Sequence, residues 1–222
     1  MARKINGEEC LPDILEDGFG GFFAAYCCKN PIGTDNKNKA YGSANPSLTI
    51  SYNGLMNGET FATSGITGTP TLSQSTTNKS NVGTYAITIA AGNLASANYN
   101  FTSFVNGVLT VDKAPLNVTA DNKSRNYGAA NPALTYTITG LVNGENLNNG
   151  GVSGTPVLTT DATASSTAGN YDITPAQGTL AASNYSFVMV KGVLAINKLA
   201  LTVTAQAKTR TYGAPDTGFA VT

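Results

Sequence analysis

The residues of this chain that could carry out chemistry recur 86 positions apart. Glu59 and Glu145 each follow an Asn-Gly dipeptide, while Lys37 and Lys123 each follow Asp-Asn. A Lys–Asn isopeptide crosslink needs a carboxylate near the lysine, so each glutamate with its lysine is a candidate for that chemistry. The competing interpretation, which we favour, is an exposed glutamate in an Asn-Gly turn.

Two other groups repeat in the same way. Asp35-Asn36 and Asp121-Asn122 could offer oxygen ligands to calcium, but that ion takes about six to eight oxygens and the carboxylates here are few and scattered. An Asx turn is the favoured interpretation. Tyr41, Tyr127 and Tyr212 each precede a glycine and could stack on sugar rings, although a position in the core or at a strand corner is the more ordinary role for such a tyrosine.

The charge content argues against most catalytic classes. The chain has 13 Lys+Arg, 13 Asp+Glu and no histidine, so 12% of it is charged, compared with about 25% in an average protein. Without histidine it lacks a Ser-His-Asp triad, a His-liganded zinc site and the commonest general base. Balanced charge gives no reason to expect nucleic-acid binding. We therefore expect no enzyme activity, no catalytic residues, no cofactor, no metal and no nucleic acid.

The cysteines and the N-terminus bear on the compartment. Cys10, Cys27 and Cys28 allow one disulfide from Cys10 to either partner, or none, and a structural or incidental role is favoured over a reactive thiol. Acidic residues follow Met1–Lys4 where an export signal would have an apolar run, so an exported protein would be represented here by a fragment. No stretch approaches the ~20 apolar residues of a membrane span, and none is expected.

The elements that must position these residues form a tandem repeat. From Asp35 to Phe101 the chain aligns without a gap to Asp121–Phe187, with 33 identities in 67 positions. A third copy opens at Leu201. The predicted divisions are a non-repeat N-terminal segment at 1–34, a first repeat domain at 35–113, a second at 114–198 and the start of a truncated third at 199–222.

Apolar residues alternate with polar ones within each repeat, as in Leu134, Tyr136 and Ile138, which indicates half-buried strands. The expected fold is all-β, with tandem small β-sandwich-like or β-grasp-like repeat domains of about 86 residues. At most a short helix is expected in each, at Leu55–Phe61 and Leu141–Leu147, because Gly and Asn disfavour helix there. The expected core of the first repeat is Tyr85, Ile87, Leu94, Tyr99, Phe101, Leu109 and Val111.

Three local expectations concern strands and connections. The basic residues Lys37, Lys39, Lys123 and Arg125 are expected along a solvated strand edge that discourages edge-to-edge pairing. Asp112–Pro115 is expected to be a four-residue linker, stiffened because the proline favours an extended residue before it. Asn30–Thr34 contains a proline and a glycine, so it is expected to be a poor opening strand, whereas Leu201–Ala205 alternates regularly.

The repeat carries a set of ordered motifs: Tyr-Gly-x, Asn-Gly-Glu, Gly-Thr-Pro, Gly-x-Tyr-x-Ile, Asn-Tyr-x-Phe and a closing Gly-Val-Leu-x-Ile/Val-x-Lys. With Tyr41-Gly42-Ser43, Tyr127-Gly128-Ala129 and Tyr212-Gly213-Ala214, these make residues 35–222 resemble the MBG repeat domain of the Tyr-Gly-x type. The resemblance implies a non-catalytic spacer or stalk in a bacterial extracellular or cell-surface protein, many of which are adhesin-like. It implies no catalytic or ligand residues, and residues 1–34 match nothing in the pattern.

Two further functions remain open. A carbohydrate-binding module would show an exposed aromatic platform that recurs in each repeat. A strand-exchanging subunit of an extracellular filament would place Leu201–Ala205 of one chain in the position of Asn30–Thr34 in another. The expected partners are therefore neighbouring repeats of the same chain, other copies through strand addition, and surface glycans or proteins.

Overall fold

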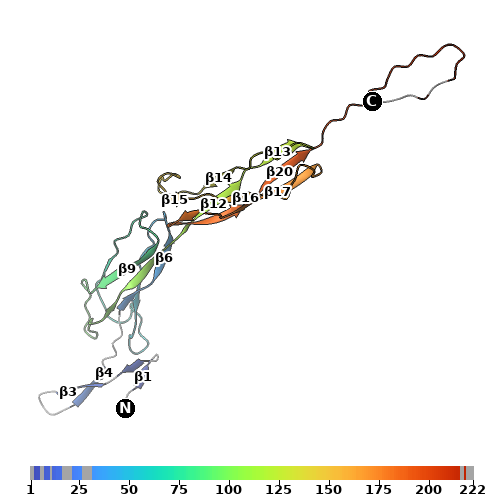
Figure 1. The fold of residues 1–222 in the computed structure, drawn as a ribbon. Helices are drawn as coiled ribbons and strands as arrows, with labels where there is room; N and C mark the ends of the chain where they lie inside the picture. The colour runs from blue at the N-terminus through green and yellow to red at the C-terminus, as the bar shows by residue number, and fades with distance from the viewer. Residues whose placement is uncertain are drawn as a thin grey trace. The chain divides into compact units, whose positions relative to one another are not determined.

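The computed structural model describes residues 3–5, 8–10, 12–16, 22–26, 32–215 and 218, and these form strands, turns and loops without a helix. The chain divides into two compact units. The first comprises residues 1–115, 140–153 and 181–186, and the second comprises 116–139, 154–180 and 187–222. The all-β fold class predicted from the sequence is confirmed (Figure 1).

The first repeat is built from seven strands. These are β5 (Ile32–Thr34), β6 (Lys37–Ala40), β7 (Ile50–Tyr52), β8 (Thr71–Ser73), β9 (Gly83–Ala90), β10 (Phe104–Val105) and β11 (Gly107–Asp112). They form a three-stranded sheet of order β10-β5-β7 and a four-stranded sheet of order β6-β11-β9-β8. In each sheet one neighbouring pair is parallel, β10 with β5 and β11 with β6, and the other pairs are antiparallel.

The second repeat has the same two sheets. Its strands are β12 (Ala114–Ala120), β13 (Lys123–Asn126), β14 (Tyr136–Thr139), β15 (Val152–Ser153), β16 (Val157–Thr159), β17 (Gly169–Ala176), β18 (Ala181–Ala182), β19 (Tyr185–Val190) and β20 (Gly192–Asn197). The sheet orders are β14-β12-β19 and β13-β20-β17-β16, and β15 pairs with β18. A shift of 86 residues carries β6, β8 and β9 onto β13, β16 and β17 at both ends. The tandem repeat is thus confirmed, while the domain borders at 113/114 and 198/199 stay a prediction.

Among the described residues, four strands precede the repeats. β1 (Arg3–Ile5) pairs antiparallel with β2 (Glu8–Cys10), and β3 (Pro12–Glu16) pairs antiparallel with β4 (Phe22–Tyr26). Cys10 ends β2, whereas Cys27 and Cys28 lie outside the described residues. The disulfide alternatives therefore stay predictions.

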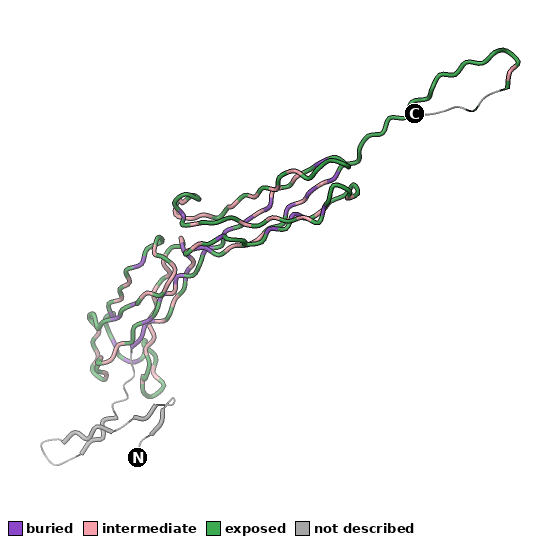
Figure 2. The backbone as a smooth tube through the Cα atoms, viewed as in Figure 1, coloured by how far each residue is buried: buried purple, intermediate pink, exposed green. Residues whose placement is uncertain are grey.

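The core follows the predicted alternation, and buried positions recur along the strands (Figure 2). In the first repeat Ile87, Leu109 and Val111 are fully buried, as predicted. The other predicted members are only half-buried: Tyr85, Leu94, Tyr99 and Phe101. Four buried apolar residues were not predicted: Ile32, Tyr41, Ile66 and Ile89. The second unit has its own core, formed by Ala120, Ala162, Ile173, Leu194 and Ile196 with Leu134, Leu158 and Tyr171 packed against it.

The opening of the first repeat corrects one expectation. Ile32, Gly33 and Thr34 form β5 and are all buried, with β5 central in its sheet. The strand begins after the proline, and a Cβ added to Gly33 would lie 3.7 Å from the carbonyl oxygen of Val105, an ordinary contact. Neither feature prevents pairing, so the prediction of a poor opening strand was wrong. By contrast, Leu201–Ala205 forms no strand, and Leu201 is 88% exposed.

The two segments that could have formed a short helix form hairpin-type turns instead. Asn143 and Gly144 have φ of 58° and 74°, and the Glu145 N–H donates to the Val142 carbonyl oxygen at 2.9 Å. Asn57 and Gly58 have φ of 56° and 73°. Two consecutive positive φ values define a type I′ turn, which Asn-Gly favours because both residues tolerate that conformation.

The predicted solvated edge is wrong for Lys39 and Arg125, which are both buried. The Lys39 ammonium donates to the Asn45 side chain at 2.8 Å and to the carbonyls of Ser43 and Thr77 at 3.2 and 2.6 Å. Arg125 makes the equivalent bond to Asn131 at 2.7 Å. Burial lowers the pKa of Lys39. Each cation thus holds a loop closed by satisfying its oxygen atoms.

The linker is also shorter than expected. β11 ends at Asp112 and β12 begins at Ala114, so only Lys113 lies between the two strands. Pro115 is the second residue of β12, before its antiparallel pairing with β14 begins at Asn117. A proline is compatible with this place because no β14 partner requires its missing N–H.

Candidate functional site

Tyr41 is the centre of the candidate site and directly follows β6, which ends at Ala40, in the first unit. Its N–H donates to the carbonyl oxygen of Asp112, the last residue of β11, at 2.8 Å. Gly42 follows with φ of 84°, and its N–H donates to the Asn78 carbonyl at 3.1 Å. The tyrosine is only 5% exposed. Backbone hydrogen bonds therefore fix the position of Tyr41 beside the end of β11, where the chain leaves the first repeat.

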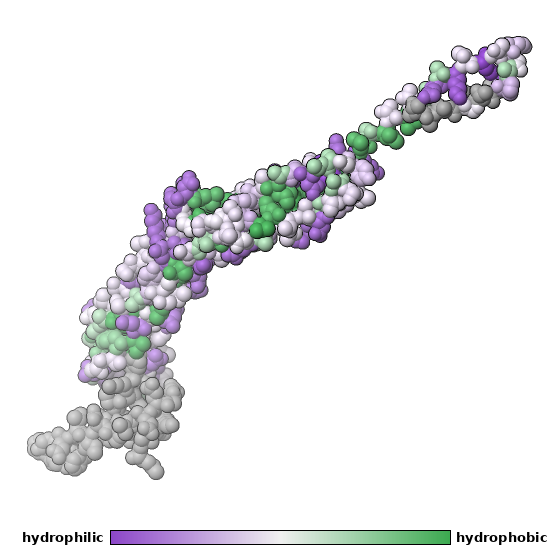
Figure 3. Space-filling model, in the orientation of Figure 1, coloured by the Kyte–Doolittle hydropathy of each residue, from purple (hydrophilic) through white to green (hydrophobic). Residues whose placement is uncertain are grey.

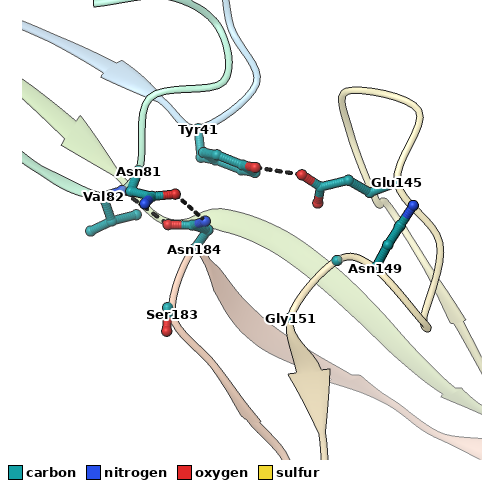
Figure 4. A pocket seen from close by; sticks show the side chains of 9 residues that line it. Tyr41, Asn81, Val82, Glu145, Asn149, Gly151, Ser183 and Asn184 are labelled. Atoms are coloured by element: carbon teal, nitrogen blue, oxygen red, sulfur yellow. Dashed lines mark hydrogen bonds between the residues drawn. The ribbon is translucent and has the colours of Figure 1, made fainter.

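The Tyr41 hydroxyl donates to Glu145, as Figure 4 shows. The type I′ turn at Asn143-Gly144 presents this glutamate, whose second oxygen accepts the Tyr185 hydroxyl at 2.5 Å. The Val142 N–H in turn donates to the Tyr185 hydroxyl at 3.2 Å. The rings of Tyr41 and Tyr185 lie 5.4 Å apart at 84°, an edge-to-face arrangement. One carboxylate thus accepts a hydrogen bond from two tyrosines that also contact each other.

The environment keeps both tyrosines protonated. Burial and the hydrogen bond to Glu145 raise the pKa of Tyr185 to about 12. The bond to Glu145 and burial also raise the pKa of Tyr41. An ionised phenol would place a second negative charge beside the carboxylate, so the neutral hydroxyl donor is favoured.

Further hydrogen bonds surround this contact. Asn184 accepts from the Val82 N–H at 3.0 Å and donates to Asn81 at 2.9 Å, as Figure 4 shows. The Lys113 ammonium donates to the Ala182 carbonyl at 3.0 Å, and the Asn143 amide donates to the Asn78 carbonyl at 3.2 Å. Tyr41, Asn81, Val82, Glu145 and Asn184 are among the residues that line a hollow of about 600 Å³. The arrangement offers hydrogen bonds and packing, and its side chains are mostly paired with one another.

Gly42 is required here for two reasons. Its φ of 84° lies in the left-handed region, which a side chain disfavours. A Cβ would also lie 2.3 Å from Cγ2 of Val142. The glycine therefore permits a close approach between the Tyr-Gly-x turn and the residue before Asn143. Gly128 has the same φ region, at 81°, but a Cβ there would meet nothing within 4 Å.

The equivalents of these residues in the other copies differ in their contacts. The Glu59–Tyr99 hydrogen bond reproduces that of Glu145 with Tyr185, and the Met56 N–H donates to the Tyr99 hydroxyl at 3.0 Å. In contrast, Tyr127 is 49% exposed and Tyr212 is fully exposed. Sequence reasoning assigned the tyrosines to core or corner positions, which fits Tyr41, but it missed the pairing with the Asn-Gly-Glu motif. The signal available was that both motifs recur together in both full copies.

The isopeptide candidates are not assembled. Glu145 and Glu59 accept hydrogen bonds from tyrosines, and neither forms an ion pair with Lys37 or Lys123 in the described part of the chain. The favoured alternative, an exposed turn glutamate, needs correction as well, because both glutamates are half-buried. Their role is to accept tyrosine hydroxyls.

The calcium candidates are used in a similar way. Asp35 accepts from the hydroxyls of Thr49 and Ser51, and Asp121 accepts from Thr135 and Thr137. These bonds lower the pKa of both aspartates. The neighbouring asparagines, Asn36 and Asn122, accept the N–H groups of Val108 and Val193 at 2.8 Å. Within residues 32–215 and the other described positions, no group of three His, Cys, Asp or Glu side chains could hold a metal.

Comparison with known proteins identifies the repeats. The MBG domain family of the YGX type matches residues 32–110 and 116–195, which together make up more than half of the chain. No curated protein matches the sequence. Over the described positions, no helical segment has the length and hydropathy of a membrane span. The matches coincide with the two copies that contain Tyr41-Gly42 and Tyr127-Gly128, so the chain belongs to the MBG domain family of the Tyr-Gly-x type.

Proposed function

We propose that this chain is a non-catalytic spacer, or stalk, module of a bacterial extracellular or cell-surface adhesin-like protein. The observation that carries the proposal is the burial of Tyr41, the tyrosine of the family's Tyr-Gly-x motif. It is buried against Glu145 and Tyr185, where it forms a structural contact and presents no surface to a ligand. The family supports the location, since MBG domains generally occur in surface proteins.

The connection between the repeats suits this function. A single residue, Lys113, separates β11 from β12, and its side chain is bound to the Ala182 carbonyl. The Ala114 N–H also donates to the Asn184 carbonyl at 3.0 Å. A connection this short leaves few backbone dihedrals free, so the spacer function predicts limited rotation between consecutive repeats. A spacer needs this stiffness to hold a distal domain away from a surface.

The carbohydrate-binding alternative has less support. It predicted an exposed aromatic platform in each repeat. The rings of Tyr52 and Phe61 are stacked with centroids 4.4 Å apart, and Phe61 is exposed. The equivalent positions of the second repeat are Ile138 and Leu147, so this aromatic pair does not recur. The filament alternative needs Leu201–Ala205 of another chain to take the position of Asn30–Thr34, but Ile32–Thr34 of the same chain already fills that position as β5.

A distance measurement tests the spacer function. Donor and acceptor dyes would be attached to cysteines introduced at Ser73 and Thr159, two exposed strand positions, after replacing Cys10, Cys27 and Cys28 with serine. A stiff connection predicts a narrow single-molecule energy-transfer distribution that broadens in Tyr41→Ala but not in the matched variant Tyr127→Ala. A distribution that is already broad in the unsubstituted chain would contradict the spacer function. A glycan array with Tyr52→Ala as control would test the alternative.

A further inference from the structure

We propose that Tyr127 and Gly128 form a docking site for the Asn-Gly-Glu turn of a further repeat of the same family, joined after Lys198. The proposal rests on the spacer function and extends it. In this proposal every repeat contacts the next one in the way that Tyr41 contacts Glu145. The partner is then a defined surface: a type I′ turn that presents a carboxylate beside a tyrosine.

The backbone of Tyr127-Gly128 already has the conformation seen at the occupied site. The Tyr127 N–H donates to the carbonyl of Asn197, the last residue of β20, at 2.9 Å, as Tyr41 does to Asp112. Gly128 has φ of 81°, close to the 84° of Gly42. Because the Tyr127-Gly128 turn is formed without a partner, docking would carry no entropic cost for ordering this turn.

The two sites differ in what covers them. Tyr41 is 5% exposed and Tyr127 is 49% exposed. The Tyr41 hydroxyl donates a hydrogen bond to Glu145, whereas the Tyr127 hydroxyl has no hydrogen-bond partner among the described residues. Val142 fills the space beside Gly42, while the space beside Gly128 is open. The same motif in the same backbone conformation is thus covered in one repeat and bare in the other.

The acceptor surface is also formed in the first repeat, where Tyr99 is the one tyrosine that donates to Glu59 among the residues whose side chains the structure describes. Asn57 and Gly58 adopt the same type I′ turn as Asn143 and Gly144. Glu59 accepts from the Tyr99 hydroxyl, as Glu145 does from Tyr185. Glu145 receives a second hydroxyl, from Tyr41. The carboxylate and its tyrosine are therefore a property of each repeat, and the second hydroxyl is supplied by the repeat before it.

The path of the chain favours a following repeat as the occupant. The chain leaves β20 at Asn197, the residue that holds Tyr127, and continues into Leu201–Ala205. This segment corresponds to Leu116–Ala120 in the central strand β12. Ala114, Leu116 and Val118 are buried in β12, whereas Leu199, Leu201 and Val203 are 63%, 88% and 64% exposed. In Figure 3 the chain is coloured hydrophobic where it leaves the second repeat, and paler or hydrophilic farther along. A repeat built on this segment would cover its apolar side chains and Tyr127 together.

Most of the surrounding contacts would be available at the second site. Lys198 stands where Lys113 stands in the first repeat, and the Ala164 carbonyl and Ala168 N–H replace those of Asn78 and Val82. Backbone groups are unaffected by these substitutions. Thr167 replaces Asn81, so the side-chain bond to the equivalent of Asn184 would differ.

The test compares the 222-residue chain with the same chain continued after Pro215 by a copy of residues 131–198, which completes a third repeat. Tyrosine nitration by tetranitromethane would be mapped by mass spectrometry. In the 222-residue chain we expect Tyr127 and Tyr212 to react and Tyr41 to be protected. In the extended chain Tyr127 should react about tenfold more slowly, because docking buries it. Tyr212 should stay reactive.

A matched pair of substitutions separates docking from mere chain extension. Glutamine in place of the copied Glu145 should restore nitration of Tyr127, whereas Glu59→Gln should not. Equal nitration of Tyr127 in both chains, with the appended repeat shown by hydrogen exchange to be folded, would overturn the proposal. Protection of Tyr127 in the 222-residue chain that rises with concentration would also overturn it, in favour of a second copy as occupant. Neither result alters the dye-distance test of the spacer function, which concerns Tyr41.

Discussion

Tyr41 and Glu145 are 104 residues apart in the chain and are joined by a hydrogen bond from the tyrosine hydroxyl to the carboxylate. Each belongs to a motif that recurs in both copies of the repeat, yet the bond joins the Tyr-Gly-x motif of one copy to the Asn-Gly-Glu motif of the other. Tyr185 binds the same carboxylate from within its own copy. The two motifs are thus complementary halves of one contact.

Tyr41→Phe should destabilise the chain by about 1–3 kcal/mol, because it removes a hydrogen bond to a charged acceptor and leaves a carboxylate oxygen partly unpaired. Urea unfolding of the 222-residue chain would measure the change. Tyr127→Phe is the matched control and should change the free energy of unfolding by less than about 0.5 kcal/mol, since its hydroxyl is exposed. Equal effects of the two substitutions would contradict the assigned role of Tyr41.

Gly42→Ala should be more destabilising than Gly128→Ala. Both glycines have positive φ, so alanine incurs the same backbone strain of about 1 kcal/mol at each site. Only at position 42 does the new Cβ also lie 2.3 Å from Val142. We expect the difference to exceed about 1 kcal/mol, as overpacking does elsewhere. Thermal unfolding of the two variants would measure it, and similar melting temperatures would argue against the close approach.

Lys39→Met should cost about 1–3 kcal/mol, because it leaves the Asn45 side chain and the carbonyls of Ser43 and Thr77 without their donor. Lys37→Met on the same strand is the control, since Lys37 is only half-buried. We expect it to be neutral to within about 0.5 kcal/mol. Chemical denaturation would compare them. A larger effect at Lys37 would mean that the buried ammonium does not hold the loop.

Gly107→Ala should destabilise the first repeat by about 1–3 kcal/mol. A Cβ there would lie 2.3 Å from the Thr34 hydroxyl and 2.8 Å from the Thr34 carbonyl oxygen, where the backbone cannot easily move. Gly33→Ala should be tolerated, since its Cβ would make ordinary contacts at 3.7 Å and alanine suits a strand better than glycine. Hydrogen exchange at Leu109 would report both effects, with faster exchange only in the Gly107 variant.

Alkaline pH should weaken the contact through Tyr185. Its pKa is raised to about 12, mainly by burial and then by Glu145, whereas an unfolded tyrosine has a pKa of about 10. The folded state therefore binds this proton more tightly. The resulting stability is fully present below about pH 10 and is lost as the pH rises through the folded pKa. The melting temperatures of the unsubstituted chain and Tyr185→Phe should converge above about pH 10. A constant gap would count against this assignment.

The amino-acid sequence by itself determined the repeat, the all-β class and the strands that alternate in polarity, because these depend on local spacing. Ile87, Leu109 and Val111 could be assigned to the core from period-two alternation alone. The Asn-Gly dipeptides likewise marked turns, since their tolerance of positive φ is a property of two adjacent residues.

Only the tertiary structure decided which of the repeated residues contact one another. Tyr41 and Tyr127 are preceded and followed by similar sequence, yet one is buried against Glu145 and the other is exposed. The sequence predicted Lys39 at a solvated strand edge, but the loop containing Thr77 covers it. Such contacts join residues distant in sequence, and local periodicity carries no information on what lies across them. Which residue contacts Tyr41 or Lys39 depends on the path that the folded chain takes between these distant segments.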